Sequence, residues 1–233
     1  MAESLPIVLV PGLLASARLY GEQIPALWRL GPVTVADHTR DDSMTAIARR
    51  ILGSAPPRFA LIGLSMGGYI SFEIMRQAPD RVAKLALLDT TARPDTPEQS
   101  EQRRAQIALA KSGRLAEVPD ILFPRLVHRM HGNDDGLRNI VRMMAGEVGP
   151  EGFVRQQTAI MERPDSRPSL AAIRCPTLVL VGDGDELTPF DRAVEIADGI
   201  AGSRLVTVPE SGHFSTLEQP RLVTEALLAL MRA

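Results

Sequence analysis

The stretch that most limits what this chain can fold into is the hexapeptide at residues 63–68, Gly-Leu-Ser-Met-Gly-Gly. A short apolar run at 59–62 comes directly before it, and residues 69–75 after it have a helical pattern. The glycines two residues before and after Ser65 fit a turn so sharp that a Cβ at either position would crowd the strand and the helix. The pattern therefore predicts a strand, a tight turn and a helix, with the Ser65 hydroxyl at the tip of the turn and facing a pocket.

Strands and helices alternate along most of the remaining chain. Short, continuously apolar runs predict six strands, at 7–10, 33–36, 59–62, 85–88, 177–181 and 205–208. Helical patterns fall between them, at about 17–29, 43–53, 66–77, 190–199 and 217–231. We therefore expect an α/β fold, with a mostly parallel sheet of about six strands and helices on both faces.

One long interval breaks this alternation. Between residues 89 and 174 no convincing strand occurs, only helix-like polar and methionine-rich segments interrupted by proline and glycine. A structureless loop of that length is implausible inside a compact domain. We therefore expect residues 1–90 and 171–233 to form the core, and residues 91–170 to form an inserted helical lid over the carboxyl ends of the strands.

The composition argues against several classes of protein. A chain of 233 residues with 45% hydrophobic residues, 23% charged residues and a net charge of -2 suits a soluble globule, and predicts binding to neither nucleic acid nor membranes. No apolar run approaches the ~20 residues of a membrane helix, and the N-terminal residues lack a basic signal-peptide region. We therefore expect a cytoplasmic protein. The single cysteine and the pair His128 and His131 supply too few ligands for a metal site, so no cofactor is expected.

If Ser65 is a nucleophile, it needs a histidine as general base, because a serine hydroxyl is weakly nucleophilic by itself. His38 and His213 each follow a predicted strand, so both can lie at the sheet edge that carries Ser65. His128 and His131 instead lie in the predicted lid. Sites of this kind run serine, acid and histidine in chain order. His213, after the last strand, is therefore the predicted base.

The acid that orients the histidine should follow another strand at the same edge. Asp185 lies in the loop after the strand at 177–181, far enough along to turn toward the pocket. Asp183 in the same loop and Asp89, after the strand at 85–88, are alternatives, and aspartate is also common in turns for structural reasons. Order and spacing favour Asp185.

Two backbone N–H groups are expected to bind the oxyanion that forms when a serine attacks a carbonyl. One belongs to Met66, directly after the nucleophile, and the other to Leu13, where Gly12 lets the first loop turn tightly. Pro11 has no N–H to donate. Because concave binding sites are mainly apolar, we also assign five apolar side chains to the substrate pocket. They are Leu14, Phe123, Met144, Leu187 and Phe214.

With these features the chain resembles the α/β-hydrolase superfamily, especially its small lidded carboxylesterase-like members, which include pimeloyl-carrier-protein methyl ester esterases. The resemblance rests mainly on segments 9–12, 63–68, 182–189 and 212–220, and so spans nearly the whole chain. It implies a serine, aspartate and histidine triad at the positions already assigned. It also implies a lid and hydrolysis of a small-molecule ester through an acyl-enzyme.

The resemblance says little about the substrate. Pro11 stands where the family usually has a histidine, and Leu64 replaces a histidine that often precedes the nucleophile, which makes that wall of the site less polar. A lyase, a perhydrolase or a C–C bond hydrolase could use the same triad, and so could a slow-turnover ligand sensor. Docking of a carrier protein would require clustered basic charge, and the sequence does not show whether the charges cluster.

Overall fold

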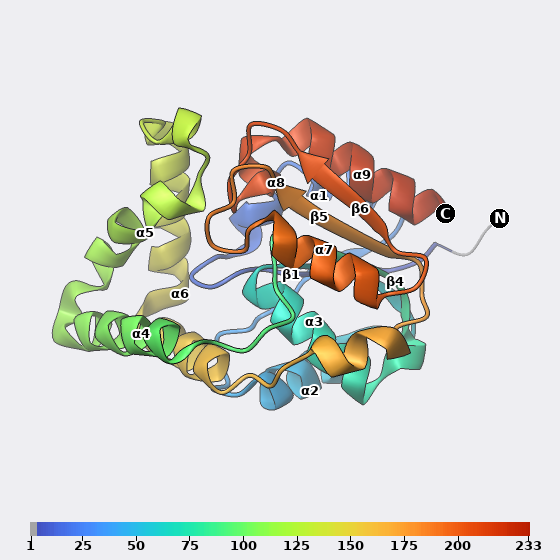
Figure 1. Ribbon diagram of the computed structural model, residues 1–233, viewed down its shortest axis with the longest axis horizontal. Helices are drawn as coiled ribbons and strands as arrows, with labels where there is room; N and C mark the ends of the chain where they lie inside the picture. The colour runs from blue at the N-terminus through green and yellow to red at the C-terminus, as the bar shows by residue number, and fades with distance from the viewer. Residues whose placement is uncertain (1–3) are drawn as a thin grey trace.

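The computed structural model describes residues 4–233, and these form a six-stranded sheet in which every strand is parallel to its neighbours (Figure 1). Across the sheet the strands run β2 (Val33–Val35), β1 (Ile7–Val10), β3 (Phe59–Leu64), β4 (Val82–Leu88), β5 (Thr177–Gly182) and β6 (Arg204–Val208). The expected α/β fold with a parallel sheet is confirmed. All six carboxyl ends therefore lie at one edge.

Helices cover both faces of the sheet because successive strand residues point to opposite sides. Val8 and Val10 pack into one hydrophobic cluster, whereas Ile7 and Leu9 pack into the other. The first cluster is covered by α2 (Met44–Ser54), α3 (Met66–Gln77) and α7 (Phe190–Gly199). The second is covered by a 3₁₀ turn (Ala17–Tyr20), α1 (Ile24–Trp28) and α9 (Pro220–Arg232).

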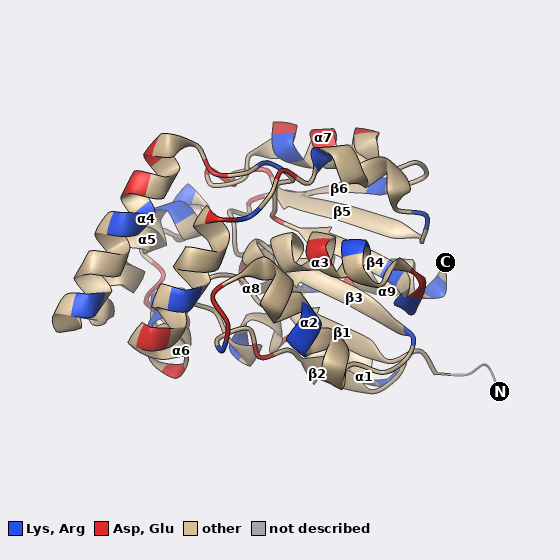
Figure 2. Ribbon diagram, turned by 90° about the horizontal axis from the view of Figure 1, so that it is seen from below, with Lys and Arg blue, Asp and Glu red and all other residues tan. Residues whose placement is uncertain are grey.

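Residues 89–176 contain no strand and hold three longer helices. These are α4 (Pro97–Leu109), α5 (Val118–Leu126) and α6 (Asp135–Met161). Figures 1 and 2 both show them gathered at one side of the sheet, toward which the arrowheads of β5 and β6 point. α6 bends at Gly149, whose φ of 71° lies outside the helical region, directly before Pro150. We call α4, α5 and α6 with their connections the helical segment.

The turn between β3 and α3 leaves no room for side chains on its glycines. A Cβ at Gly67 would overlap the backbone carbonyl of Val10 in the neighbouring strand. No comparable neighbour surrounds Gly146, an exposed residue inside α6. The tight packing of α3 against β1 therefore depends on glycine at position 67.

We expect Gly67→Ala to destabilise the fold by about 3 kcal/mol, because the added methyl must displace backbone in a packed core. Gly146→Ala is the matched control, and should stabilise the chain by about 0.5–1 kcal/mol because alanine costs less entropy in a helix. Urea unfolding followed by circular dichroism measures both changes. Equal midpoints for the two variants would contradict the packing described here.

No helix in residues 4–233 combines the length and the apolar character needed to cross a membrane.

Candidate active site

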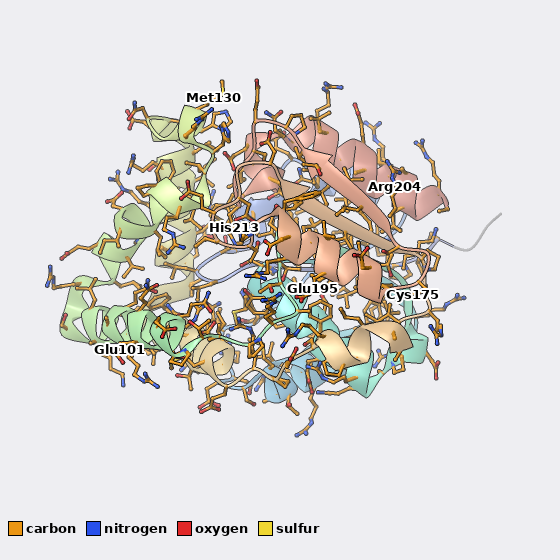
Figure 3. The ribbon with its side chains drawn as sticks, viewed as in Figure 1. Glu101, Met130, Cys175, Glu195, Arg204 and His213 are labelled. Atoms are coloured by element: carbon orange, nitrogen blue, oxygen red, sulfur yellow. The ribbon has the colours of Figure 1, made fainter. Side chains whose placement is uncertain are left out.

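Three loops at the carboxyl edge of the sheet bring Ser65, His213 and Asp185 into one chain of hydrogen bonds. Ser65 Oγ lies 2.8 Å from His213 Nε2, and His213 Nδ1 lies 2.8 Å from Asp185 Oδ2. A carboxylate only accepts hydrogen bonds, so Nδ1–H donates to Asp185 and Nε2 of the neutral ring is left to accept from the serine. Figure 3 shows His213 on the side of the sheet that faces the helical segment.

The backbone at Ser65 is held in an unusual conformation. Its φ of 56° and ψ of -114° are costly for a residue with a Cβ, by about 1–3 kcal/mol. Neighbouring strands stabilise this conformation: Ser65 N–H donates to Leu88 O at 2.9 Å, and Thr90 Oγ1 donates to Ser65 O at 2.8 Å. Leu14 and Asp89, on the two adjacent loops, also have positive φ. Backbone strain is therefore concentrated around the serine.

Asp185 is buried and surrounded by donors. Its Oδ1 accepts from the N–H groups of Leu187 and Thr188, at 2.8 and 3.0 Å, and its Oδ2 accepts from the Thr188 hydroxyl at 2.6 Å. Burial opposes ionisation, but His213 and these hydrogen bonds outweigh it and lower the pKa of the Asp185 carboxyl. Asp185 is thus an ionised group with a fixed orientation. Thr188, directly before Pro189, is part of this environment.

The loop that carries His213 is fastened by the buried carboxylate of Glu218, in the short helix α8 (Ser215–Glu218). Glu218 accepts from Gly212 N–H at 2.8 Å and from His128 N–H at 2.6 Å. His131 Nδ1 lies 2.9 Å from the same carboxylate. One side chain therefore joins the histidine loop to the helical segment.

The pKa of His213 predicts how activity depends on pH. Burial alone would lower this pKa, but the adjacent Asp185 carboxylate outweighs burial and raises it. Protonated His213 cannot accept the serine proton, so a reaction at Ser65 should be lost as the pH falls through a pKa above the ordinary value of about 6.5. Asp185→Asn should shift the midpoint of kcat/KM against pH downward. An unshifted midpoint in profiles from pH 5 to 9 would contradict this assignment.

The two other candidate acids lie near the histidine but do not bond to it. Asp89 is completely buried, accepts from Gly182 N–H at 2.9 Å and is hydrogen-bonded to the Ser215 hydroxyl. Burial and the nearby charge of Asp185 raise its pKa well above the ordinary value. Asp183 is exposed, and its Oδ1 accepts from Ser211 N–H at 3.2 Å. Both carboxylates therefore hydrogen-bond to the backbone of loops around the site, and Asp185 alone of the three contacts His213.

The two expected oxyanion donors flank the serine. Met66 is the first residue of α3, and Leu13 lines the cavity above Ser65. Within residues 4–233, neither backbone N–H has an acceptor. Both groups are therefore free to bind an oxygen that enters the site.

A buried network that the sequence did not reveal supports the loop containing Leu13. Leu14 N–H donates to Gln156 Oε1 at 3.0 Å, and Gln156 Nε2 lies 3.0 Å from His38 Nε2. His38 Nε2 in turn lies 2.9 Å from Gly12 O. Burial lowers the pKa of His38, which keeps the ring neutral. His38 is thus a support of the loop, and no sequence motif marks Gln156 in α6 as its partner.

A cleft with about 1320 Å³ of empty space, part of it open to solvent, lies between the helical segment and Ser65. Leu14, Leu187 and Phe214 line it, as predicted for the substrate pocket. Phe123 and Met144 do not: both are completely buried and pack the helical segment against the core. Their apolar character reflects that packing, and much of the cleft wall is instead glutamine and arginine.

The remaining reactive side chains do not gather into a second site. No group of three or more histidine, cysteine, aspartate or glutamate side chains that could hold a metal ion occurs in residues 4–233. Cys175 lies at the opposite end of β5 from the loops that carry Ser65, Asp185 and His213, as Figure 3 shows. Burial raises the pKa of its thiol, which makes it a poor nucleophile.

The sequence matches a known protein family along most of its length. The model of the alpha/beta hydrolase family matches residues 7–226, and the chain therefore belongs to that family. The resemblance inferred from the sequence is confirmed.

Individual relatives include enzymes with different names. The pimeloyl-[acyl-carrier protein] methyl ester esterase of Nitrosomonas europaea is 25% identical over 222 residues, covering 90% of this chain and 87% of that one. The 2-hydroxy-6-oxononadienedioate/2-hydroxy-6-oxononatrienedioate hydrolase of Escherichia coli (strain K12) is 25% identical over 219 residues, covering 86% and 72%. A thermophilic esterase from Thermogutta terrifontis, solved with malate bound, superimposes with a TM-score of 0.88 at 32% identity, covering 98% and 89%. The chain is thus a hydrolase-family member with esterase relatives.

Proposed function

We propose that this protein is a carboxylesterase that cleaves esters of small to medium acyl groups through an acyl-enzyme on Ser65. The observation that carries the proposal is the 2.8 Å contact of Ser65 Oγ with His213 Nε2 at the floor of an open cleft. Relatives that are named esterases support the same class of reaction. The substrate is a small molecule, and the reaction uses no cofactor.

The reaction proceeds in two halves. His213 Nε2 takes the proton of Ser65 as Oγ attacks the ester carbonyl, and the imidazolium is stabilised by Asp185. The tetrahedral oxyanion accepts hydrogen bonds from the N–H groups of Leu13 and Met66. When the intermediate collapses, the C–O bond to the alcohol breaks and His213 returns its proton to the leaving oxygen. Water, deprotonated by His213, then releases the acid and restores the serine.

A C–C bond hydrolase is the second candidate, since one relative is a 2-hydroxy-6-oxononadienedioate hydrolase. A sensor that turns over slowly would use the same residues. Steady hydrolysis of p-nitrophenyl esters with two- to eight-carbon acyl chains supports the esterase. A single stoichiometric burst supports the sensor. Labelling of Ser65 by a fluorophosphonate without ester turnover supports the C–C hydrolase and overturns the esterase.

A further inference from the structure

The charged side chains that line the cleft are all of one sign. Five arginines line it and no lysine, aspartate or glutamate does so within residues 4–233. The five are Arg93, Arg103, Arg125, Arg163 and Arg192. A wall whose charged side chains are all positive attracts anions and repels cations. It therefore favours a bound molecule that carries negative charge.

Most of these arginines are already neutralised. Arg93 makes a forked contact with Glu195, and Arg103 and Arg163 share the single buried carboxylate of Asp95. These pairs have a structural explanation: Arg93 with Glu195 joins the connection before α4 to α7, and the two pairs with Asp95 hold α4 to the chain that follows α6. Arg192 in turn lies 3.1 Å from Asp191.

Arg125 has no such explanation. It is exposed, lines the cleft, and has neither an ion-pair partner nor a hydrogen-bond partner for its side chain within residues 4–233. Five cations thus meet three carboxylates, those of Glu195, Asp95 and Asp191, so positive charge is in excess along the cleft. Of the five, only Arg125 has its whole planar donor fork available.

The backbone beside Arg125 is hydrogen-bonded to the loop that carries His213. Arg125 stands near the end of α5, next to Leu126, whose carbonyl accepts from Phe214 N–H at 3.0 Å. Phe214 directly follows His213, and both line the cleft with Arg125. A backbone hydrogen bond therefore joins the C-terminal end of α5, which carries Arg125, to the loop that carries the general base.

The wall of the cleft formed by α4 is also polar, and within residues 4–233 it carries no acidic side chain. α4 turns Gln99, Gln102, Arg103 and Gln106 toward the cleft, which is the i, i+3, i+4, i+7 face of one helix. Amide groups at these positions can hydrogen-bond a polar ligand. An acyl pocket for a purely hydrocarbon chain would place apolar residues on this face.

We propose that the preferred substrates are esters that carry a free carboxylate, such as half-esters of dicarboxylic acids, and that Arg125 binds this carboxylate. The proposal rests on the esterase function proposed above and specifies its substrate class. A guanidinium fork and a carboxylate form two parallel hydrogen bonds, whereas an uncharged ester end gains nothing comparable.

The test compares monomethyl with dimethyl esters of the C4 to C8 straight-chain diacids. We expect kcat/KM for the best monomethyl ester to exceed that for its dimethyl ester about tenfold, and the ratio to shrink in 0.5 M salt because Arg125 is exposed. Arg125→Gln should bring the ratio close to one, and Arg125→Lys should restore part of it. Arg129→Gln is the matched control, an exposed arginine outside the cleft that should keep the wild-type ratio.

Ratios near one in the wild type, or an unchanged ratio in Arg125→Gln, would overturn the proposal. A general loss of folding cannot mimic the expected result, because it lowers both rates together. If neither ester is hydrolysed, the esterase function fails. Whether Arg125 binds a carboxylate is then decided separately, by calorimetric measurement of ester binding to the Ser65→Ala protein. Tighter binding of the monomethyl ester that disappears in Ser65→Ala/Arg125→Gln supports the carboxylate site, and equal affinities overturn it.

Discussion

Replacing Ser65 with alanine is expected to lower kcat for ester hydrolysis by up to about 10⁶-fold, since the acyl-enzyme can no longer form. The fold should survive, because alanine keeps the Cβ and so the same backbone strain at φ 56°. Steady-state kinetics and fluorophosphonate labelling measure the loss. Thermal unfolding of the same sample should match the wild type to within about 1 kcal/mol.

Ser65→Gly offers an informative comparison. It also removes the nucleophile, but it relieves the strain of a positive φ and should raise the unfolding free energy by about 1 kcal/mol or more. Retained ester turnover in Ser65→Ala, with contaminating activity excluded by inhibitor titration, would show that the chemistry does not run through this residue.

The second large effect is expected for Asp185→Asn, with a fall in kcat of about 10⁴-fold. The carboxylate accepts from His213 Nδ1–H at 2.8 Å and so holds the ring with Nε2 free to accept the serine proton. An amide can present its NH₂ group to the ring instead, which favours the other tautomer and leaves Nε2 protonated. Steady-state kinetics with a p-nitrophenyl ester measure the change, and KM should vary far less than kcat.

Asp89→Asn is the matched control for this substitution. Asparagine has nearly the same shape as aspartate and keeps an oxygen that can accept from Gly182 N–H, and Asp89 does not contact His213. Its contacts with Gly182 N–H and Ser215 lie behind the triad, and kcat should fall less than about tenfold. If Asp89→Asn proved more damaging than Asp185→Asn, the assignment of the acid would have to be reversed.

Strand and helix positions followed closely from local pattern. The predicted strand at 177–181 is β5 (Thr177–Gly182), and the predicted helix at 66–77 is α3 (Met66–Gln77). Buried parallel strands are continuously apolar, and this signal needs no knowledge of neighbours. The helical segment lacks such apolar runs, so the sequence predicted no strand there. The boundaries of a lid at 91–170 stay a prediction.

The residues that line the cleft could not be predicted from local pattern in the same way. Phe123 and Met144 have the composition expected of a pocket, yet they fill the space between the helical segment and the core. Gln156 supports the loop at Leu14 across 142 positions of the chain, a contact that no spacing rule indicates. Side chains on helices connect to distant partners only through tertiary packing, so their roles are not encoded locally.

Ser65, Asp185 and His213 could be assigned from the sequence alone because each follows a strand, and parallel strands deliver their carboxyl ends to one edge. The charge of the cleft depended on something else. Twelve lysines and arginines against eleven acids in residues 91–170 suggest balance. Ion pairing depends on distances between elements that are far apart in sequence, so only the folded chain decides which arginines a carboxylate neutralises. Within residues 4–233 it leaves Arg125 unpaired, near the loop that carries His213.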